Sequence, residues 1–116
     1  MSESVLHRGL TPERWNRFPL ERRLLMIGSE FGRAVQLVTE DGGRTDAHRC
    51  YQRARELATW TIQTVPTAEL LASRLADVIR MIDETDFERW ELPRLVQRSN
   101  TLVELVNHLS AQDHAV

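Results

Sequence analysis

Side chains that commonly bind metals or transfer protons are few in this sequence. Its four histidines are His7, His48, His108 and His114. A di-iron helical bundle requires two Glu-x-x-His motifs, and the sequence contains none. Glu104 and His108 stand four residues apart and would share one helix face, but a single such pair does not make a metal site. We interpret it as an ordinary surface pair.

Cys50 is the only thiol, so no disulfide can form within one chain. His48 is two residues away and would face elsewhere on a helix, so no histidine is placed to activate the sulfur. We interpret Cys50 as a buried structural thiol. The sequence also lacks a Gly-rich phosphate loop, a Walker lysine and a G-x-S-x-G elbow. We therefore predict a non-enzymatic protein with no metal and no cofactor.

The cations are fifteen arginines with no lysine, and the formal net charge is −2. A GC-rich genome accounts for the arginine bias, and selection for bidentate or stacked contacts would produce it too. The slightly acidic balance gives the whole molecule no strong attraction for nucleic acid. Apolar residues make up 41% of the 116 residues, enough for the core of one domain.

Apolar side chains recur with steps of three and four residues, which predicts four helices over 19–40, 45–64, 67–84 and 93–110. In the first helix the inward residues are Leu20, Leu24, Ile27, Phe31, Ala34 and Val38, widened by Leu25, Gly28 and Val35. In the second they are Ala47, Cys50, Tyr51, Ala54, Leu57, Ala58, Thr61 and Ile62. In the third and fourth they are Leu71, Leu75, Val78, Ile79, Ile82, Leu95, Leu102, Val106 and Leu109.

Capping residues mark where the helices should begin and end. Thr11 before Pro12 predicts a short extra helix over 12–17, and Thr45 is the expected N-cap of the second long helix. Glycine at 42–43 supplies a left-handed C′ position for the first long helix. Thr85 and Glu88 fit a capping box, which predicts a further short helical turn over 86–91.

Short connections make successive helices antiparallel neighbours, so we expect an all-α, antiparallel up-down four-helix bundle. Residues 1–116 should form one domain, with 1–10 and 111–116 irregular or frayed. No apolar run approaches the length of a membrane span, and no basic, apolar leader opens the chain. With its single cysteine, this composition fits a cytoplasmic location.

Two groups of residues are candidates for an interface. Arg49, Arg53, Glu56 and Trp60 follow 4-3-4 spacing on the side of the second long helix away from its alanines. Arginine and tryptophan frequently anchor interfaces, although this face could equally be solvated, with Trp60 folded against a neighbouring helix. The other candidates are the aromatic residues of the connections, Trp15, Phe87 and Trp90, which either plug the ends of a bundle or mark a dimer contact.

Gly28 and Gly32 stand four residues apart in the first long helix, where each costs about 1 kcal/mol relative to alanine. Close packing of another helix, or room for a bulky side chain such as Trp60, would offset that cost. A site where a ligand approaches or a face for self-association would also do so.

We carry three hypotheses of function from the sequence. The first is a helical bundle that acts through protein–protein contacts, as a homodimer. The second is a nucleic-acid-associated module, in which the 8–23 segment, with five arginines and two glutamates and so a net charge of +3, cooperates with two arginines of the second long helix. Its arginines are Arg8, Arg14, Arg17, Arg22, Arg23, Arg49 and Arg53. The third is a small-molecule-binding bundle with an apolar pocket near Gly28 and Gly32.

Overall fold

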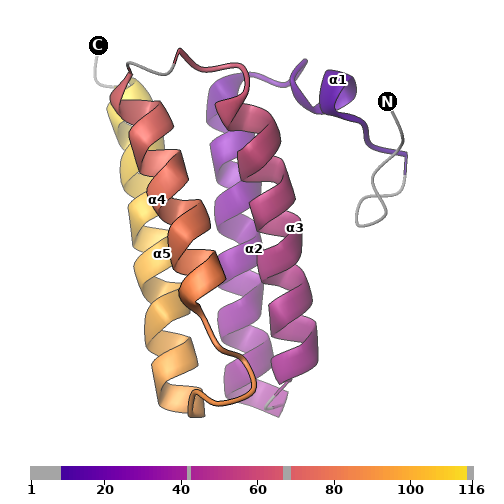
Figure 1. Ribbon diagram of the computed structural model, residues 1–116, viewed down its shortest axis with the longest axis vertical. Helices are drawn as coiled ribbons and strands as arrows, with labels where there is room; N and C mark the ends of the chain where they lie inside the picture. Colours follow the sequence, from indigo (N-terminus) through magenta and orange to yellow (C-terminus); the bar gives the residue numbers. More distant parts are fainter. Residues whose placement is uncertain (1–8, 42, 67–68, 115–116) are drawn as a thin grey trace.

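The computed structural model describes residues 9–41, 43–66 and 69–114, and this part of the chain is helical without any strand. The helices are α1 (Pro12–Trp15), α2 (Leu20–Asp41), α3 (Arg44–Ile62), α4 (Leu70–Glu84) and α5 (Leu92–His114). Figure 1 shows the four long helices side by side, with α1 next to one end of the group. The predicted all-α fold with four long helices is therefore confirmed at the level of helix packing.

Each long helix packs against particular neighbours. α2 lies against both α3 and α5 along much of its length, and α3 lies against α4. α4 and α5 approach each other at fewer positions. In the described ranges, none of the helices combines the length and the apolarity that crossing a membrane requires. An open hollow lies where the connection between α4 and α5 meets the first turns of α5.

The predicted inward stripes form the core. Leu24, Phe31, Leu75 and Leu102, one or two from each of three helices, are fully shielded from solvent. The alanine-rich stripe of α3 is buried as well, which lets neighbouring helices approach it closely. The prediction for Leu25 is wrong. Its side chain is 53% exposed and does not widen the buried stripe of α2. At 100° per residue, it follows Leu24 around the helix and turns away from α3 and α5.

The short helix α1 closes the end of the bundle. Thr11 accepts a hydrogen bond from the Arg14 N–H at 3.2 Å and caps α1 as predicted. Trp15 is completely buried, and its indole Nε1 donates to Thr61 Oγ1 of α3 at 2.9 Å. The Thr61 hydroxyl donates in turn to Leu57 O at 2.8 Å, so every polar atom of this contact is satisfied.

The N-cap of α3 differs from the predicted one. α3 begins at Arg44 after Gly43, since the Ala47 N–H already donates to Gly43 O at 2.9 Å, and Thr45 is not the N-cap. Gly43 has a φ of −75°, so it is not a left-handed C′ glycine; Gly42 lies outside the described residues.

The 86–91 segment makes a single turn with the hydrogen bond of an α-helix, from the Trp90 N–H to Asp86 O at 3.0 Å, and this turn does not continue into a helix. The Thr85 hydroxyl donates a hydrogen bond to Met81 O of α4 at 2.7 Å and does not cap this segment. Asp86 takes the capping role, because its Oδ1 accepts the N–H groups of Glu88 and Arg89, both at 3.0 Å.

The ends of the chain differ from the prediction in one respect. α5 continues to His114, past the predicted end near 110, because the helical hydrogen bonding persists through 111–114. Residues 1–8 and 115–116, which include His7 and Arg8, and the predicted start of the third long helix at Thr67 lie outside the described residues.

Candidate functional site

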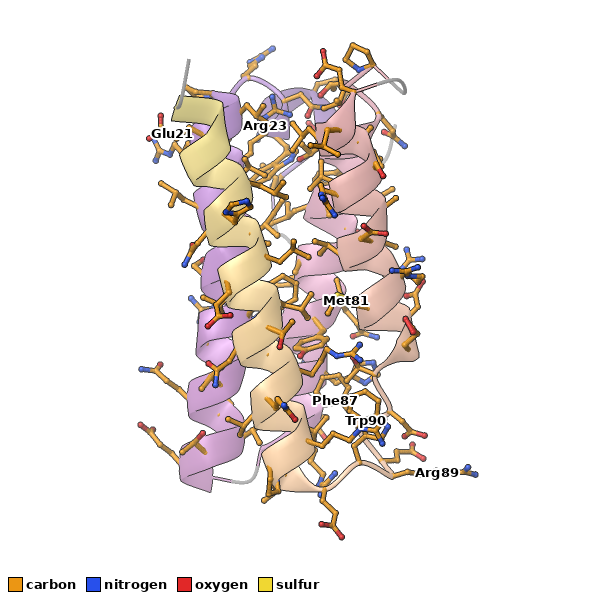
Figure 2. All side chains as sticks on the ribbon, turned by 90° about the vertical axis from the view of Figure 1, so that its left-hand side faces the viewer. Glu21, Arg23, Met81, Phe87, Arg89 and Trp90 are labelled. Atoms are coloured by element: carbon orange, nitrogen blue, oxygen red, sulfur yellow. The ribbon has the colours of Figure 1, made fainter. Side chains whose placement is uncertain are left out.

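An open hollow at the α4–α5 end of the bundle is the candidate functional site. It has a volume of about 710 Å³, and its lining residues are Asp86, Arg89, Trp90, Glu91, Pro93, Arg94 and Gln97. A smaller hollow of about 250 Å³ shares three of these residues and is lined by Met81, Trp90, Arg94, Gln97, Arg98 and Thr101. Figure 2 places Met81 and Trp90 in this region, with Arg89 projecting outward from the connection. We call the combined surface the Trp90 hollow.

The backbone around Trp90 is fixed by contacts from two sides. Asp86 O accepts the Trp90 N–H at 3.0 Å and closes the turn. From α3, the Arg44 guanidinium donates Nη1–H bonds to Phe87 O at 2.9 Å and to Trp90 O. A charged donor satisfies both carbonyls, and such bonds are stronger than neutral ones. The first residue of α3 therefore holds the α4–α5 connection in place.

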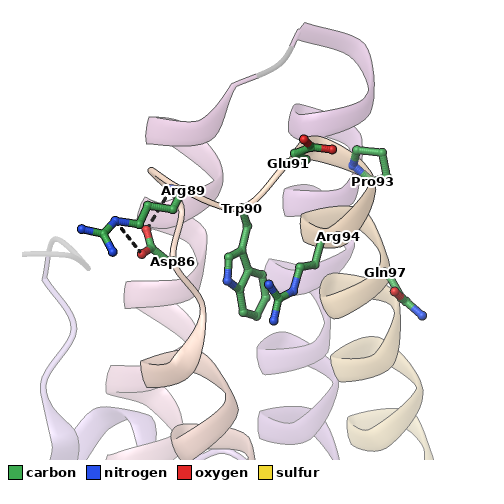
Figure 3. A pocket seen from close by; sticks show the side chains of 7 residues that line it. All are labelled: Asp86, Arg89, Trp90, Glu91, Pro93, Arg94 and Gln97. Atoms are coloured by element: carbon green, nitrogen blue, oxygen red, sulfur yellow. Dashed lines mark hydrogen bonds and ion pairs between the residues drawn. The ribbon is translucent and has the colours of Figure 1, made fainter.

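Two arginines of α5 stack on the Trp90 indole. The guanidinium carbon of Arg94 lies 3.7 Å from the ring centroid, and that of Arg98 lies 5.0 Å from it. Figure 3 shows the Arg94 guanidinium beside the indole. Arg98 also donates its Nη1–H to Met81 O of α4 at 2.9 Å. The half-buried Trp90 side chain thus forms a platform for two positive charges.

The acidic side chains of the Trp90 hollow form no ion pair with Arg94 or Arg98. Asp86 pairs with Arg89, Oδ2 to Nε, at 3.9 Å. In Figure 3 the Glu91 carboxylate points away from the indole on which Arg94 lies. No carboxylate of the described residues lies within ion-pair distance of Arg94 or Arg98. The indole face of the hollow is therefore positively charged.

The aromatic core beneath the connection is rigid and hydrogen-bonded. Phe87 packs edge-on against Tyr51 at 4.7 Å between centroids, and His48 stacks on Phe87 at 4.8 Å. The buried Tyr51 hydroxyl shares a 2.7 Å hydrogen bond with Ser99 of α5. Burial raises the pKa of Tyr51 to about 12. This cluster connects α3, the connection and α5 under the Trp90 hollow.

The aromatic interface candidates divide by burial. Trp15 is fully buried and Phe87 is buried to 6% exposure, so within this chain both fill the ends of the bundle. Trp60 packs against the core and is partly buried. Trp90 alone of this group combines partial burial with a place in an open hollow. The structure does not bring Trp60 and Trp90 into one surface. Trp60 lies near the end of α3 that contacts α1, and Trp90 lies in the connection that contacts the start of α3.

The two arginine candidates of α3 have different surroundings. Arg49 is exposed. Arg53 forms a bidentate pair with Glu30 of α2, at 2.8 and 3.2 Å, and donates to Cys50 Sγ at 3.2 Å. The hydrogen bond to Glu30 raises the pKa of Arg53, and burial raises the pKa of the Cys50 thiol. Cys50 is buried as predicted, and Arg53 is committed to holding α2 against α3.

The N-terminal arginines are largely occupied within the chain. Arg23 is only 8% exposed and donates to Phe18 O, Asn16 Oδ1 and Thr64 Oγ1, and burial lowers its pKa. Arg14 donates to Gly9 O, and the guanidinium of Arg22 lies 5.0 Å from the Phe18 centroid. Arg17 is exposed. Of these arginines, Arg23 alone is buried, and Arg14, Arg17 and Arg22 are exposed.

The two glycines of α2 meet different surroundings. A Cβ on Gly28 would lie 3.4 Å from Val106 Cγ1, so α5 packs closely against α2 at this position. A Cβ on Gly32 would meet no atom within 4 Å. Close packing therefore does not explain Gly32, because no neighbouring helix covers that position of α2.

Sequence reasoning did not select Arg44, Arg94 or Arg98. The spacing of Trp90, Arg94 and Arg98, four residues each, is a signal that could have found two of them. The described residues contain no group of three or more histidine, cysteine or acidic side chains placed to hold a metal ion. No protein-family model, curated protein or solved structure matches the chain.

Proposed function

We propose that this protein is a non-enzymatic helical bundle that acts through protein–protein contacts, and that the Trp90 hollow is its contact surface for a partner protein. The stacking of Arg94 and Arg98 on a half-buried tryptophan in an open hollow carries this proposal. Tryptophan and arginine are the residue types that contribute most to interfaces when they are ordered before binding.

The framework that we propose behind this surface is an antiparallel up-down bundle. Arg23, near the start of α2, bonds Thr64 after the end of α3, which supports opposite directions for these two helices. Arg44 at the start of α3 bonds carbonyls after the end of α4. Arg98 in α5 bonds Met81 near the end of α4, as a tight reversal between them would require.

Site-specific photo-cross-linking in the source organism tests this function. A photoreactive amino acid at Gln97, an exposed residue of the Trp90 hollow, should yield a covalent product of defined mass with a second protein. Replacing Trp90 by alanine should remove that product. The control places the same group at Gln52, an exposed position of α3. If the Gln97 position gives no product that depends on Trp90, the proposal is wrong.

A further inference from the structure

We infer that the partner presents an acidic segment, and that Arg94 binds one of its carboxylates directly. This inference rests on the proposed function and names the chemistry of the partner. The Arg94 guanidinium has no carboxylate of the described residues within ion-pair distance, and it donates no hydrogen bond to them. Among the described residues, the partner of its charge is the face of the Trp90 indole.

Stacking prepares Arg94 for this role. A distance of 3.7 Å between the guanidinium carbon and the ring centroid is that of a stacked pair, and a stacked guanidinium keeps the N–H groups at its edge available. A carboxylate accepts two parallel N–H bonds from such an edge. The stack also restricts the side chain before binding, so less conformational entropy is lost when the carboxylate arrives.

Arg98 supplies a second position for an acidic side chain. It lies one turn further along α5, so the two arginine positions are separated by about 6 Å along the helix axis. Alternate residues of an extended peptide are separated by about 6.6 Å. One Nη1–H of Arg98 is bonded to Met81 O, and its remaining donors can bind a second carboxylate. An extended segment that contacts both arginines therefore has acidic residues at every second position.

Nucleic acid fits the Trp90 hollow less well. The indole face that a base would stack on is occupied by Arg94. Asp86 and Glu91 line the hollow and would repel a phosphate backbone. The carboxylates of an extended peptide lie on side chains, so a peptide can direct two of them at Arg94 and Arg98 and keep its neutral backbone near Asp86 and Glu91. The observations therefore favour an acidic protein segment.

Fluorescence anisotropy with the full-length protein tests this inference. The probe is a labelled peptide in which aspartate alternates with serine, and its control carries asparagine in place of aspartate. We expect the wild-type protein to bind only the aspartate peptide, and to bind it more weakly as the salt concentration rises. Arg94→Ala should weaken binding roughly tenfold, the scale of one charge-assisted contact, and Arg94→Lys should restore only part of it.

Arg80→Ala is the matched control, because Arg80 is an exposed arginine of α4 outside the hollow. Its peptide binding should equal that of the wild type, and circular dichroism should show that both variants keep the wild-type thermal transition. Equal losses in Arg80→Ala and Arg94→Ala would overturn the inference, as would tighter binding of a thymidine oligonucleotide. Displacement of the peptide by an equimolar small dicarboxylate such as succinate would also overturn it.

The outcomes separate this inference from the proposed function. If the aspartate peptide does not bind but the Trp90-dependent cross-link forms, the acidic partner is wrong and the contact surface stands. If the peptide binds through Arg94 but no cross-linked protein is found, the proposed function fails and the carboxylate site stands.

Discussion

Arginine side chains in this protein have different roles because their surroundings differ. Arg23, Arg53 and Arg94 carry the same guanidinium, but the first is buried on neutral acceptors, the second pairs with Glu30 and the third stacks on Trp90. Only the guanidinium of the third donates no hydrogen bond to any described residue. Its accessibility makes Arg94 the side chain on which we expect recognition to depend.

The ionisation of Tyr51 can be measured without interference from other tyrosines, because it is the only tyrosine of the chain. Its pKa is raised to about 12 in the folded state by burial, against an ordinary value of about 10. The stability from this group is complete below pH 10 and is lost as the pH rises toward 12, since the folded state retains a proton that the unfolded state releases.

An absorbance titration of tyrosinate formation should therefore have its midpoint near pH 12 in the native protein and near pH 10 in concentrated urea. Tyr51→Phe should show no tyrosinate signal and should lose about 1 kcal/mol of stability, because Ser99 loses its buried partner. A native midpoint near pH 10 would show that the hydroxyl is open to solvent.

The two glycines of α2 give a second prediction at this scale. Gly32→Ala should stabilise the protein by about 1 kcal/mol, raising the melting temperature by about 4 °C, because alanine is the better helix former and meets open space. Gly28→Ala should gain less, since its Cβ would press against Val106. Thermal unfolding at low protein concentration compares them, and a larger gain for Gly28→Ala would contradict the packing described for α5.

At the scale of helices, two arginine–carboxylate pairs join α3 to its neighbours with different consequences. The Arg53–Glu30 pair to α2 has side chains 19% and 10% exposed, whereas the Arg55–Asp83 pair to α4 has side chains 45% and 50% exposed. Water screens an exposed pair, and it also supports either partner when the other is removed. A shielded carboxylate left alone has no such support.

We therefore predict that Arg53→Met destabilises the protein by about 2 kcal/mol, because the shielded Glu30 carboxylate then keeps only its 3.6 Å ion pair with the exposed Arg33. The matched variant Arg55→Met should cost at most about 1 kcal/mol. Urea denaturation of both variants measures the difference. The double variant Glu30→Leu with Arg53→Met should recover most of the loss, and equal costs for the two single variants would refute the distinction.

For the whole molecule, we propose that two copies associate through the outer face of α2. Leu25 and Met26 are 53% and 36% exposed there, and Gly32 on the same helix meets open space within the chain. Apolar side chains grouped on a surface gain free energy when a second surface covers them. This face is separate from the Trp90 hollow, so a dimer would leave both hollows accessible.

Sedimentation equilibrium tests the dimer. At about 50 µM we expect twice the chain mass of 13.5 kDa, shifting toward the monomer on dilution. Leu25→Glu should give the monomer at every concentration, with its helical content unchanged. The control Gln52→Glu introduces the same charge at an exposed position of α3 and should behave as the wild type. A wild-type mass of 13.5 kDa at this concentration would exclude the homodimer.

The sequence alone determined the helices and the residues they bury. Steps of three and four residues identified the inward faces that hold Leu24, Phe31, Leu75 and Leu102, because the period of an α-helix is fixed by its backbone geometry. The start of α1 after Thr11 could also be predicted, since a cap depends on residues within one turn. The burial of Cys50 followed from the same stripe.

Only the tertiary structure decided which polar and aromatic side chains remain available for function. Trp15 and Trp90 both lie outside the four long helices, but Trp15 is buried and bonded to Thr61, whereas Trp90 is partly buried and stacks on Arg94. Arg44 reaches carbonyls more than forty residues away in the chain. Such contacts depend on how far apart helices pack and where they end, and no local pattern of residues encodes those distances.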